Sequence, residues 1–150
     1  MPNLPAQVGK AMTAICQGED ATEADVSIAA EIFDSIGKSI VIEEKFMDAI
    51  TAVSGSGPAY VFLFVECLEK AAQALGLNEK LSKELVRQTL RGSLNLLEKS
   101  GEEARVLRQK VTSKGGTTEA ALEVLLKNNI EKIFTEALLA AKKRAGELSK

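Results

Sequence analysis

Histidine and tryptophan are both absent from this 150-residue sequence, and aromatic residues make up only 4% of it. The absence of histidine excludes a serine–histidine catalytic triad, the common zinc sites and a histidine proton shuttle. The formal net charge of −2 argues against a general nucleic-acid-binding protein. We therefore expect neither a metal ion nor a nucleic acid as a partner.

Long hydrophobic runs and closely spaced cysteines are also lacking. The strongest apolar stretch, Ala59 to Val65, is too short to span a bilayer, and no signal peptide opens the chain. Cys16 and Cys67 have no metal-ligand spacing, and we expect each to be a small buried apolar residue. The sequence thus indicates a cytoplasmic protein that does not contact membranes.

The first part of the chain has the pattern of a strand–helix–strand unit. Strand-like composition covers residues 8–17 and 39–43. For the helix between them, Thr22 is the expected N-cap, with Asp25 three residues later as in a capping box. Gly37 is expected at the C′ position that ends this helix. Because so small a unit cannot close a sheet by itself, we interpret residues 1–46 as an incomplete α/β domain.

The remaining residues, 47–150, are predicted to be almost entirely helical. Glycines, Pro58 and Asn78 mark the expected starts and ends of helices. The expected helices cover residues 46–53, 58–75, 79–99, 102–111, 118–127 and 130–148. The fold class is therefore mainly α, with a short strand–helix–strand segment in front.

Residues 60–65 are apolar around the whole circumference of the predicted helix, so a single buried stripe cannot accommodate them. A helix of this kind must be surrounded, and about 100 helical residues supply few elements to surround it. We expect a second copy of the chain to complete a helical bundle in an interleaved homodimer. The alternative is a helix at the centre of a monomeric bundle.

Residues 111–118, with the sequence VTSKGGTT, place two glycines and two threonines directly before an amphipathic helix. A glycine pair permits a positive φ and a sharp turn. The amides of Gly116, Thr117 and Thr118 can then converge at the start of the helix, where a carboxylate or phosphate is favoured. The alternative is an ordinary glycine turn with a threonine cap.

Several motifs together resemble pyrroline-5-carboxylate reductase. They are MPNLPAxVG at 1–9, DAITAVSGSGPAY at 48–60, QT at 88–89, LRxxVTSxGGTT at 107–118 and AAxxRxxEL at 140–148. The family reduces 1-pyrroline-5-carboxylate to L-proline with NADPH or NADH, and its Rossmann domain precedes the helical domain. This sequence has no GxGxxG element. The resemblance therefore implies that residues 1–46 are the tail of a Rossmann-type cofactor domain and residues 47–150 the dimerisation and substrate-binding domain.

The resemblance also implies roles for individual residues. The implied substrate-binding residues are Glu44, Ser113, Gly115, Gly116, Thr117 and Thr118. The Thr118 hydroxyl would bond to the ring nitrogen of the substrate and is the expected catalytic contact. Glu44 would favour the cationic imine, although a solvated acid at a strand end is an equal alternative. Asn3 and Lys110 would lie near the dinucleotide, which the Rossmann domain mainly holds, although an ordinary surface lysine is the simpler reading of Lys110.

Two residues depart from the family pattern: Lys114 stands where proline is usual, and Ala11 where glycine is common. Without the proline we expect a less preorganised loop. The leading interpretation is the dimer core and substrate loop of the reductase, inactive by itself, in a homodimer or an assembly of such dimers. The alternative is a non-catalytic helical dimerisation module. A different dehydrogenase with a Rossmann and a helical domain is a more remote reading.

Overall fold

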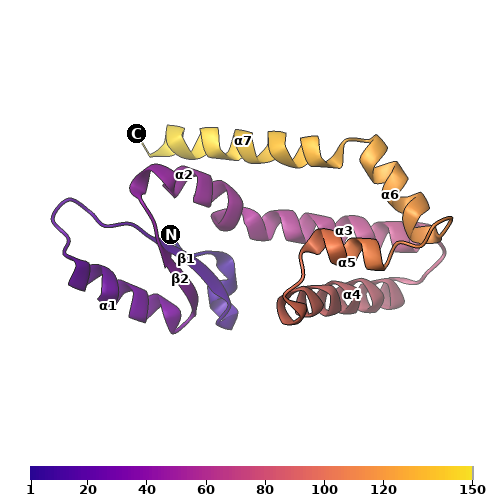
Figure 1. Cartoon of the computed structure of the whole chain (residues 1–150), viewed down its shortest axis with the longest axis horizontal. Coiled ribbons are helices and arrows are strands. Elements are labelled where there is room, and N and C mark those ends of the chain that lie inside the picture. Colours follow the sequence, from indigo (N-terminus) through magenta and orange to yellow (C-terminus); the bar gives the residue numbers. More distant parts are fainter. Residues whose placement is uncertain (150) are drawn as a thin grey trace. The chain divides into compact units, whose positions relative to one another are not determined.

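The structure, a computed structural model, describes residues 1–149. It is mainly helical with a short parallel β–α–β segment, as the sequence predicts (Figure 1). The elements are β1 (Ala11–Ile15), α1 (Glu23–Asp34), β2 (Gly37–Val41), α2 (Met47–Ile50), α3 (Gly57–Ala74), α4 (Glu79–Ser100), α5 (Ala104–Lys110), α6 (Thr117–Lys127) and α7 (Ile130–Leu148). Packing divides the chain into a first unit, Met1–Val61 with Phe134–Lys150, and a second unit, Phe62–Ile133. These units do not test the predicted domain boundary after residue 46, which stays a prediction.

Strands β1 and β2 pair in parallel, with Ala11 opposite Gly37 and Ile15 opposite Val41, and α1 forms the crossover that a parallel pair requires. A Cβ atom on Gly37 would lie only 2.2 Å from the carbonyl oxygen of Ala11. The prediction that Gly37 ends α1 is therefore wrong. It is the first residue of β2, and the close approach of the two strands requires a glycine there.

The start of α1 confirms the predicted capping box. The Thr22 hydroxyl oxygen accepts the N–H of Asp25 at 3.3 Å, and the N–H of Thr22 donates to the Asp25 carboxylate at 2.8 Å. The hydrogen bonds from the side chain and backbone of Thr22 lower the pKa of Asp25. The chain's own side chains thus occupy the donors at this helix start.

The passage from β2 to α3 is more irregular than the predicted helix over 46–53. A 3₁₀ turn (Glu44–Phe46) precedes α2, and a π-helical turn (Thr51–Gly55) follows it. At this turn the N–H of Ser56 donates to the carbonyl of Thr51 at 2.8 Å. Residues 52–57, with the sequence AVSGSG, permit this wider turn. The sequence does not predict it, because a π turn has no simple residue pattern.

The continuous helical stretch Glu44–Ala74 is 31 residues long with a mean hydropathy of 1.3 over its most apolar window. By length and composition alone it is sufficient to cross a membrane. The strongest apolar run in the sequence covers only residues 59–65, and the structure joins this run to α2 in one helical stretch. A helix at the centre of a soluble assembly has the same properties, so this stretch is weak evidence for a membrane span.

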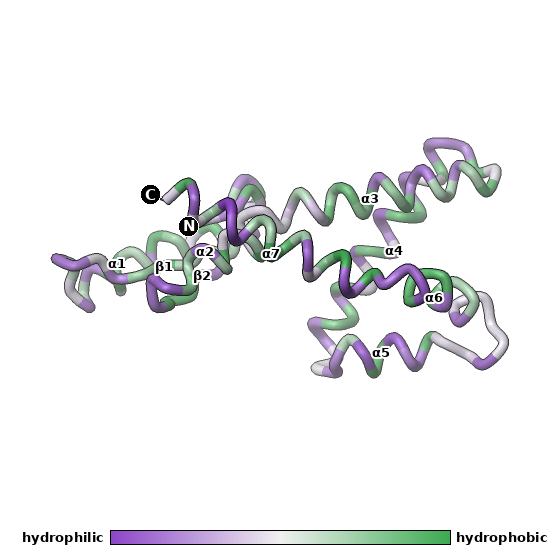
Figure 2. The backbone as a smooth tube through the Cα atoms, turned by 90° about the horizontal axis from the view of Figure 1, so that it is seen from above, coloured by the Kyte–Doolittle hydropathy of each residue, from purple (hydrophilic) through white to green (hydrophobic). Residues whose placement is uncertain are grey.

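Few side chains are buried within the single chain. The buried apolar residues among those described are Ala11, Ala14, Ile15, Ala52 and Val86. The hydrophobic first half of α3, visible as a green stretch in Figure 2, is exposed, and Phe62 retains 53% of its surface. The chain exposes 11462 Å², whereas a folded monomer of 16.0 kDa exposes about 7,400 Å². The alternative of α3 at the centre of a monomeric bundle is therefore wrong.

The same exposure corrects the prediction for the cysteines. Cys67 on α3 is exposed in the single chain, and Cys16 at the end of β1 is half-buried; both are free thiols. The expectation that each is buried failed for Cys67 because it assumed that α3 is covered by its own chain. The environment of Cys67 therefore depends on what covers α3.

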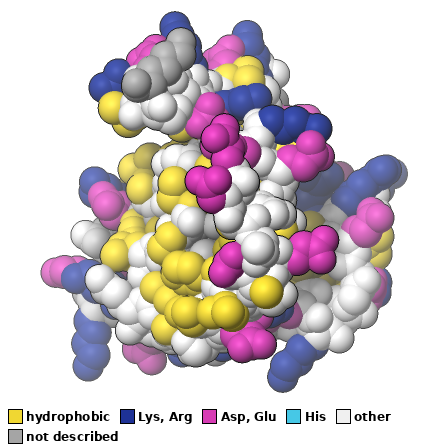
Figure 3. Space-filling model, turned by 90° about the vertical axis from the view of Figure 1, so that its left-hand side faces the viewer, with side chains coloured by type: hydrophobic (Ala, Val, Ile, Leu, Met, Phe, Trp, Pro, Cys, Tyr) yellow, Lys and Arg dark blue, Asp and Glu magenta, His cyan; other side chains and the backbone are white. Residues whose placement is uncertain are grey.

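The strand–helix–strand segment also keeps apolar side chains open to solvent. Its exposed large apolar residues include Ile28 and Ile32 of α1 and Ile40 and Val41 of β2. Figure 3 views the molecule from the side on which this segment lies and shows hydrophobic side chains gathered on that face. A parallel sheet ordinarily has both faces covered. These faces are thus uncovered in the single chain, and the interpretation of residues 1–46 as an incomplete α/β domain stays a prediction.

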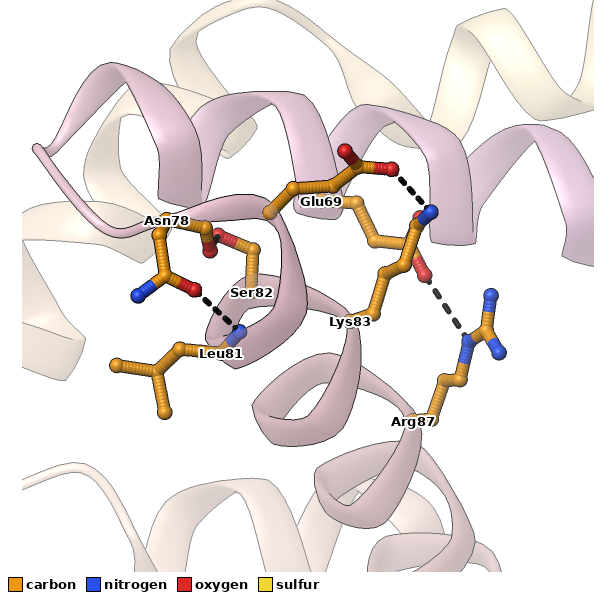
Figure 4. Close-up of polar contacts among 7 residues, drawn as sticks. Glu69, Asn78, Leu81, Ser82, Lys83 and Arg87 are labelled. Atoms are coloured by element: carbon orange, nitrogen blue, oxygen red, sulfur yellow. Dashed lines mark hydrogen bonds and ion pairs between the residues drawn. The ribbon is translucent and has the colours of Figure 1, made fainter.

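In the second unit, α3 and α4 form a helical hairpin whose turn is built as predicted (Figure 4). Gly76, with φ +93°, follows α3, and the Asn78 side chain accepts the N–H of Leu81 at 2.9 Å to cap α4. Arg87 of α4 donates to Glu69 of α3 at 3.1 Å, and only 13% of the Glu69 side chain is exposed. This ion pair joins the two helices more than two turns beyond the cap.

Candidate functional site

The glycine loop lies between α5 and α6 in the second unit, and its two glycines are required for different reasons. Gly115 has φ +73°, a conformation in which a side chain is strained. Gly116 is extended and is the N-cap of α6, which begins at Thr117, one residue earlier than predicted. A Cβ atom on Gly116 would lie 2.4 Å from the Ser113 hydroxyl oxygen and 3.0 Å from its carbonyl oxygen. Residue 115 thus requires a glycine because of its positive φ. Residue 116 requires a glycine because Ser113 leaves no space for a Cβ atom.

The loop amides divide into two groups. The N–H of Gly116 donates to the Ser113 carbonyl at 3.0 Å, and the N–H of Gly115 donates to the Glu119 carboxylate at 2.6 Å. These two amides serve the turn itself, which differs from the expectation that the Gly116 amide points outward. The amides of Thr117 and Thr118 belong to the first turn of α6 and so have no acceptor within the helix, and Gly116 has no side chain that could accept them.

Thr118, the predicted catalytic contact, is half-buried on the first turn of α6, whereas Thr117 is exposed. The free amides of this turn lie at the positive end of the helix dipole. The geometry can therefore hold an anion at the start of α6, the helix that carries Thr118. The carboxylate site, and the individual contacts of Ser113, Gly115, Gly116, Thr117 and Thr118 with a substrate, stay predictions.

A hollow of about 380 Å³ lies beside the loop, between α5 and α6. Its lining residues are Arg108, Gln109, Thr112, Glu119, Leu122, Glu123 and Leu126. None of the predicted substrate-binding residues, Thr118 included, lines this hollow. The candidate anion site is therefore the start of α6 and not this hollow.

Lys110, predicted to lie near the cofactor, is the last residue of α5. Its ammonium contacts both carboxylate oxygens of Glu102, at 2.6 and 2.7 Å. The pair holds the end of α5 against the segment that precedes it. Lys110 thus has an acid partner within the chain, and its contact with the cofactor stays a prediction.

Asn3, the other residue predicted for the cofactor side, joins three parts of the first unit. Its amide nitrogen donates to the carbonyl and hydroxyl oxygens of Ser54, at 3.2 and 3.3 Å, and its amide oxygen accepts the N–H of Met12 at 3.0 Å. The side chain thus ties the chain start to β1 and to the π-helical turn. Its contact with a dinucleotide stays a prediction.

Glu44 is exposed at the first position of the 3₁₀ turn that follows β2. The neighbouring Lys45 pairs with Glu43 at 2.6 Å instead. Glu44 belongs to the first unit and the glycine loop to the second. The predicted meeting of Glu44 with the substrate nitrogen therefore stays a prediction.

Sequence reasoning missed Glu119, whose carboxylate bonds to the loop. Glu119 is the third residue of α6, so it stands three residues after the N-cap Gly116. That spacing is the one found in a capping box and was available in the sequence. Within residues 1–149, the structure groups no three histidine, cysteine, aspartate or glutamate residues in a way that fits a metal ion.

Comparison with known proteins bears on the whole chain. Residues 44–148 match the family described as "Pyrroline-5-carboxylate reductase dimerisation". The chain is 38% identical over 148 residues to pyrroline-5-carboxylate reductase 2 of Bacillus subtilis, covering 99% of this chain and 53% of that protein. It is 43% identical over 149 residues to pyrroline-5-carboxylate reductase of Arabidopsis thaliana, covering 99% of this chain and 54% of that protein.

A solved structure gives the same match in three dimensions. The crystal structure of Plasmodium falciparum pyrroline carboxylate reductase with NADP bound superposes with a TM-score of 0.95 at 37% identity. The match covers 100% of this chain and 62% of that chain. The chain spans about half the length of the curated relatives it matches.

Proposed function

Because the chain belongs to the pyrroline-5-carboxylate reductase family, we propose that it supplies the dimer core and the substrate-carboxylate loop of such an enzyme. The reaction is the NADPH- or NADH-dependent reduction of 1-pyrroline-5-carboxylate to L-proline, and we propose the cytoplasm as its location. The chain spans about half of its curated relatives, so this activity is a proposal for the assembled enzyme.

The observation that carries the proposal is the start of α6. The turn uses the amides of Gly115 and Gly116 internally and leaves those of Thr117 and Thr118 without an acceptor in the helix. A carboxylate that accepts these two N–H groups is further favoured by the helix dipole. The substrate's carboxylate has the charge and the paired oxygens that this arrangement suits.

The residues of this chain would bind and orient the substrate. With the carboxylate on the α6 amides, the Thr118 hydroxyl can bond to the ring nitrogen, and the carboxylate of Glu44 would favour its cationic form. The dinucleotide supplies the hydride. Asn3 and Lys110 make hydrogen bonds and an ion pair within the chain, and their contact with the dinucleotide stays a prediction.

Self-association of the chain follows from the family match, and we propose a homodimer, or an assembly of such dimers, as its form. The exposed excess of about 4,000 Å² over a compact monomer is far larger than the roughly 800 Å² per partner of a standard interface. An extensive interface, interleaved as the sequence predicts, would cover part of this excess. The exposed apolar face of α3 is the part of the second unit that such an interface would cover.

The alternative is a helical dimerisation module without the chemistry. Titrating the labelled chain with L-proline, while following the amide resonances of residues 115–118 by NMR, separates the two. The reductase proposal expects selective, saturable shifts at Thr117 and Thr118, and none with L-prolinamide, which lacks the carboxylate. No shift with L-proline, in the wild-type chain and in Lys114→Pro alike, would contradict the proposal and favour the module.

A further inference from the structure

We propose that Glu119 is the positioning residue of the glycine loop: its carboxylate fixes the turn that leaves the first amides of α6 free for an anion. The carboxylate accepts the N–H of Gly115 at 2.6 Å. Gly115 is the loop residue with positive φ, so the bond holds the least restrained position of the turn. Only the identity of the anion in this inference rests on the proposed function.

The bond is a capping box shifted by one residue. In a capping box the third helical residue reaches back to the N–H of the N-cap, and the N-cap side chain accepts an N–H in return. Here the N–H of Gly116, the N-cap, is already bonded to the Ser113 carbonyl at 3.0 Å. Glu119 therefore reaches one residue further back, to Gly115.

The returning half of the box is missing because the N-cap is a glycine. A serine or threonine at residue 116 would place an oxygen on the amides of the first turn and occupy them. The Ser113 side chain and carbonyl also fill the space that a Cβ atom at residue 116 would need. The Glu119 carboxylate thus holds the loop, while the N–H groups of the first turn of α6 remain without a side-chain acceptor.

The length of the Glu119 side chain is the testable feature. Glu119→Asp keeps the negative charge at the helix start but is one methylene too short for the Gly115 amide. Glu119→Gln keeps the length and an acceptor oxygen but loses the charge. Glu123 lies one turn further along α6 and lines the same hollow, so Glu123→Asp is the matched control.

The measurement is amide exchange with water by NMR, residue by residue, in the chain and its three variants. We expect the Gly115 amide to exchange about tenfold faster in Glu119→Asp, about twofold faster in Glu119→Gln and unchanged in Glu123→Asp, given the usual strength of a bond to a charged acceptor. Unchanged Gly115 exchange in Glu119→Asp, or equal acceleration in Glu123→Asp, would overturn the positioning role.

Titration with L-proline on the same samples tests the consequence for binding. We expect the dissociation constant to rise about threefold to tenfold in Glu119→Asp and to stay near the wild-type value in Glu119→Gln and Glu123→Asp. An unchanged dissociation constant in Glu119→Asp would overturn the inference that the bond between Glu119 and Gly115 prepares the anion site at the start of α6. A wild-type chain that binds no L-proline, but whose Gly115 exchange depends on Glu119, would contradict the proposed function and leave the positioning of the turn supported.

Discussion

Two helices of this chain, α1 and α6, begin with the same spacing of cap and acid but leave different groups open. At α1, Thr22 and Asp25 bond to each other in both directions. At α6, the N-cap is Gly116, and Glu119 bonds to the residue before it. A polar side chain at the N-cap thus accepts a backbone N–H of the first turn. Without such a side chain these N–H groups are left for a ligand.

The apolar segments show the same contrast. Most of β1 is buried by its own chain, and Thr13 and Ala14 have at most 1% of their surface exposed. The apolar run of α3 is between 43 and 59% exposed at Val61, Phe62, Leu63 and Phe64. Strand β1 is therefore covered by its own chain, whereas the apolar run of α3 is left open in the single chain.

Phe62→Asp gives the largest expected effect on this contrast. Covering a carboxylate that has no partner costs about 3 kcal/mol or more, so we expect self-association to weaken by over about a hundredfold. Analytical ultracentrifugation of the variant against wild type measures this, with Phe62→Leu as an apolar control. Equal self-association of Phe62→Asp and wild type would show that the apolar face of α3 does not form the interface between chains.

Gly115→Ala tests the loop side of the comparison. Forcing a side chain into the left-handed region costs about 1–2 kcal/mol, so we expect a lower urea midpoint and altered amide shifts through residue 118. Gly18→Ala is the control, since Gly18 has no positive φ and open space at its Cβ position. The idea fails where the two alanine variants unfold at the same urea concentration.

Thr22→Ala removes the N-cap of α1. We expect the free energy of unfolding to fall by about 1 kcal/mol, while the L-proline response of the glycine loop is unchanged. Thr22→Ser, which retains the hydroxyl oxygen, is expected to restore most of the loss. Urea unfolding followed by circular dichroism measures both free energies of unfolding. An L-proline response of the glycine loop that changes in Thr22→Ala would contradict a purely local role of this cap.

Lowering the pH is the mildest test of the α1 cap. The bonds from Thr22 lower the pKa of Asp25 from the ordinary value of 3.8. The ionised carboxylate therefore stabilises the helix start fully above pH 3.8, and the contribution is lost as the pH falls through the lower folded-state pKa. We expect the Thr22 amide resonance to follow this titration. In Asp25→Asn the transition should vanish, and its persistence would assign it to another acid.

Local chemistry allowed much of the fold to be predicted. Thr22 and Asn78 were expected to begin helices, and the structure places each at an N-cap. Each signal lies within a few residues of the bond that it forms, so no tertiary information is needed. The glycine loop was predicted for the same reason.

Features that depend on distant contacts were missed. Gly37 was read as a helix end because the approach of Ala11, which requires the glycine, lies 26 residues away. The burial of Cys67 was predicted wrongly because its own chain does not cover α3. Glu119 was overlooked although its spacing was visible, because its partner is one residue outside the usual capping pattern.

The small set of apolar residues that one chain buries has a consequence for the thermodynamics of this protein. Where folding and association form one equilibrium, stability is a property of the solution as well as of the sequence. Each tenfold dilution of such a dimer removes about 1.4 kcal/mol from its apparent stability. A melting temperature for this chain is therefore meaningful only when the protein concentration is stated beside it.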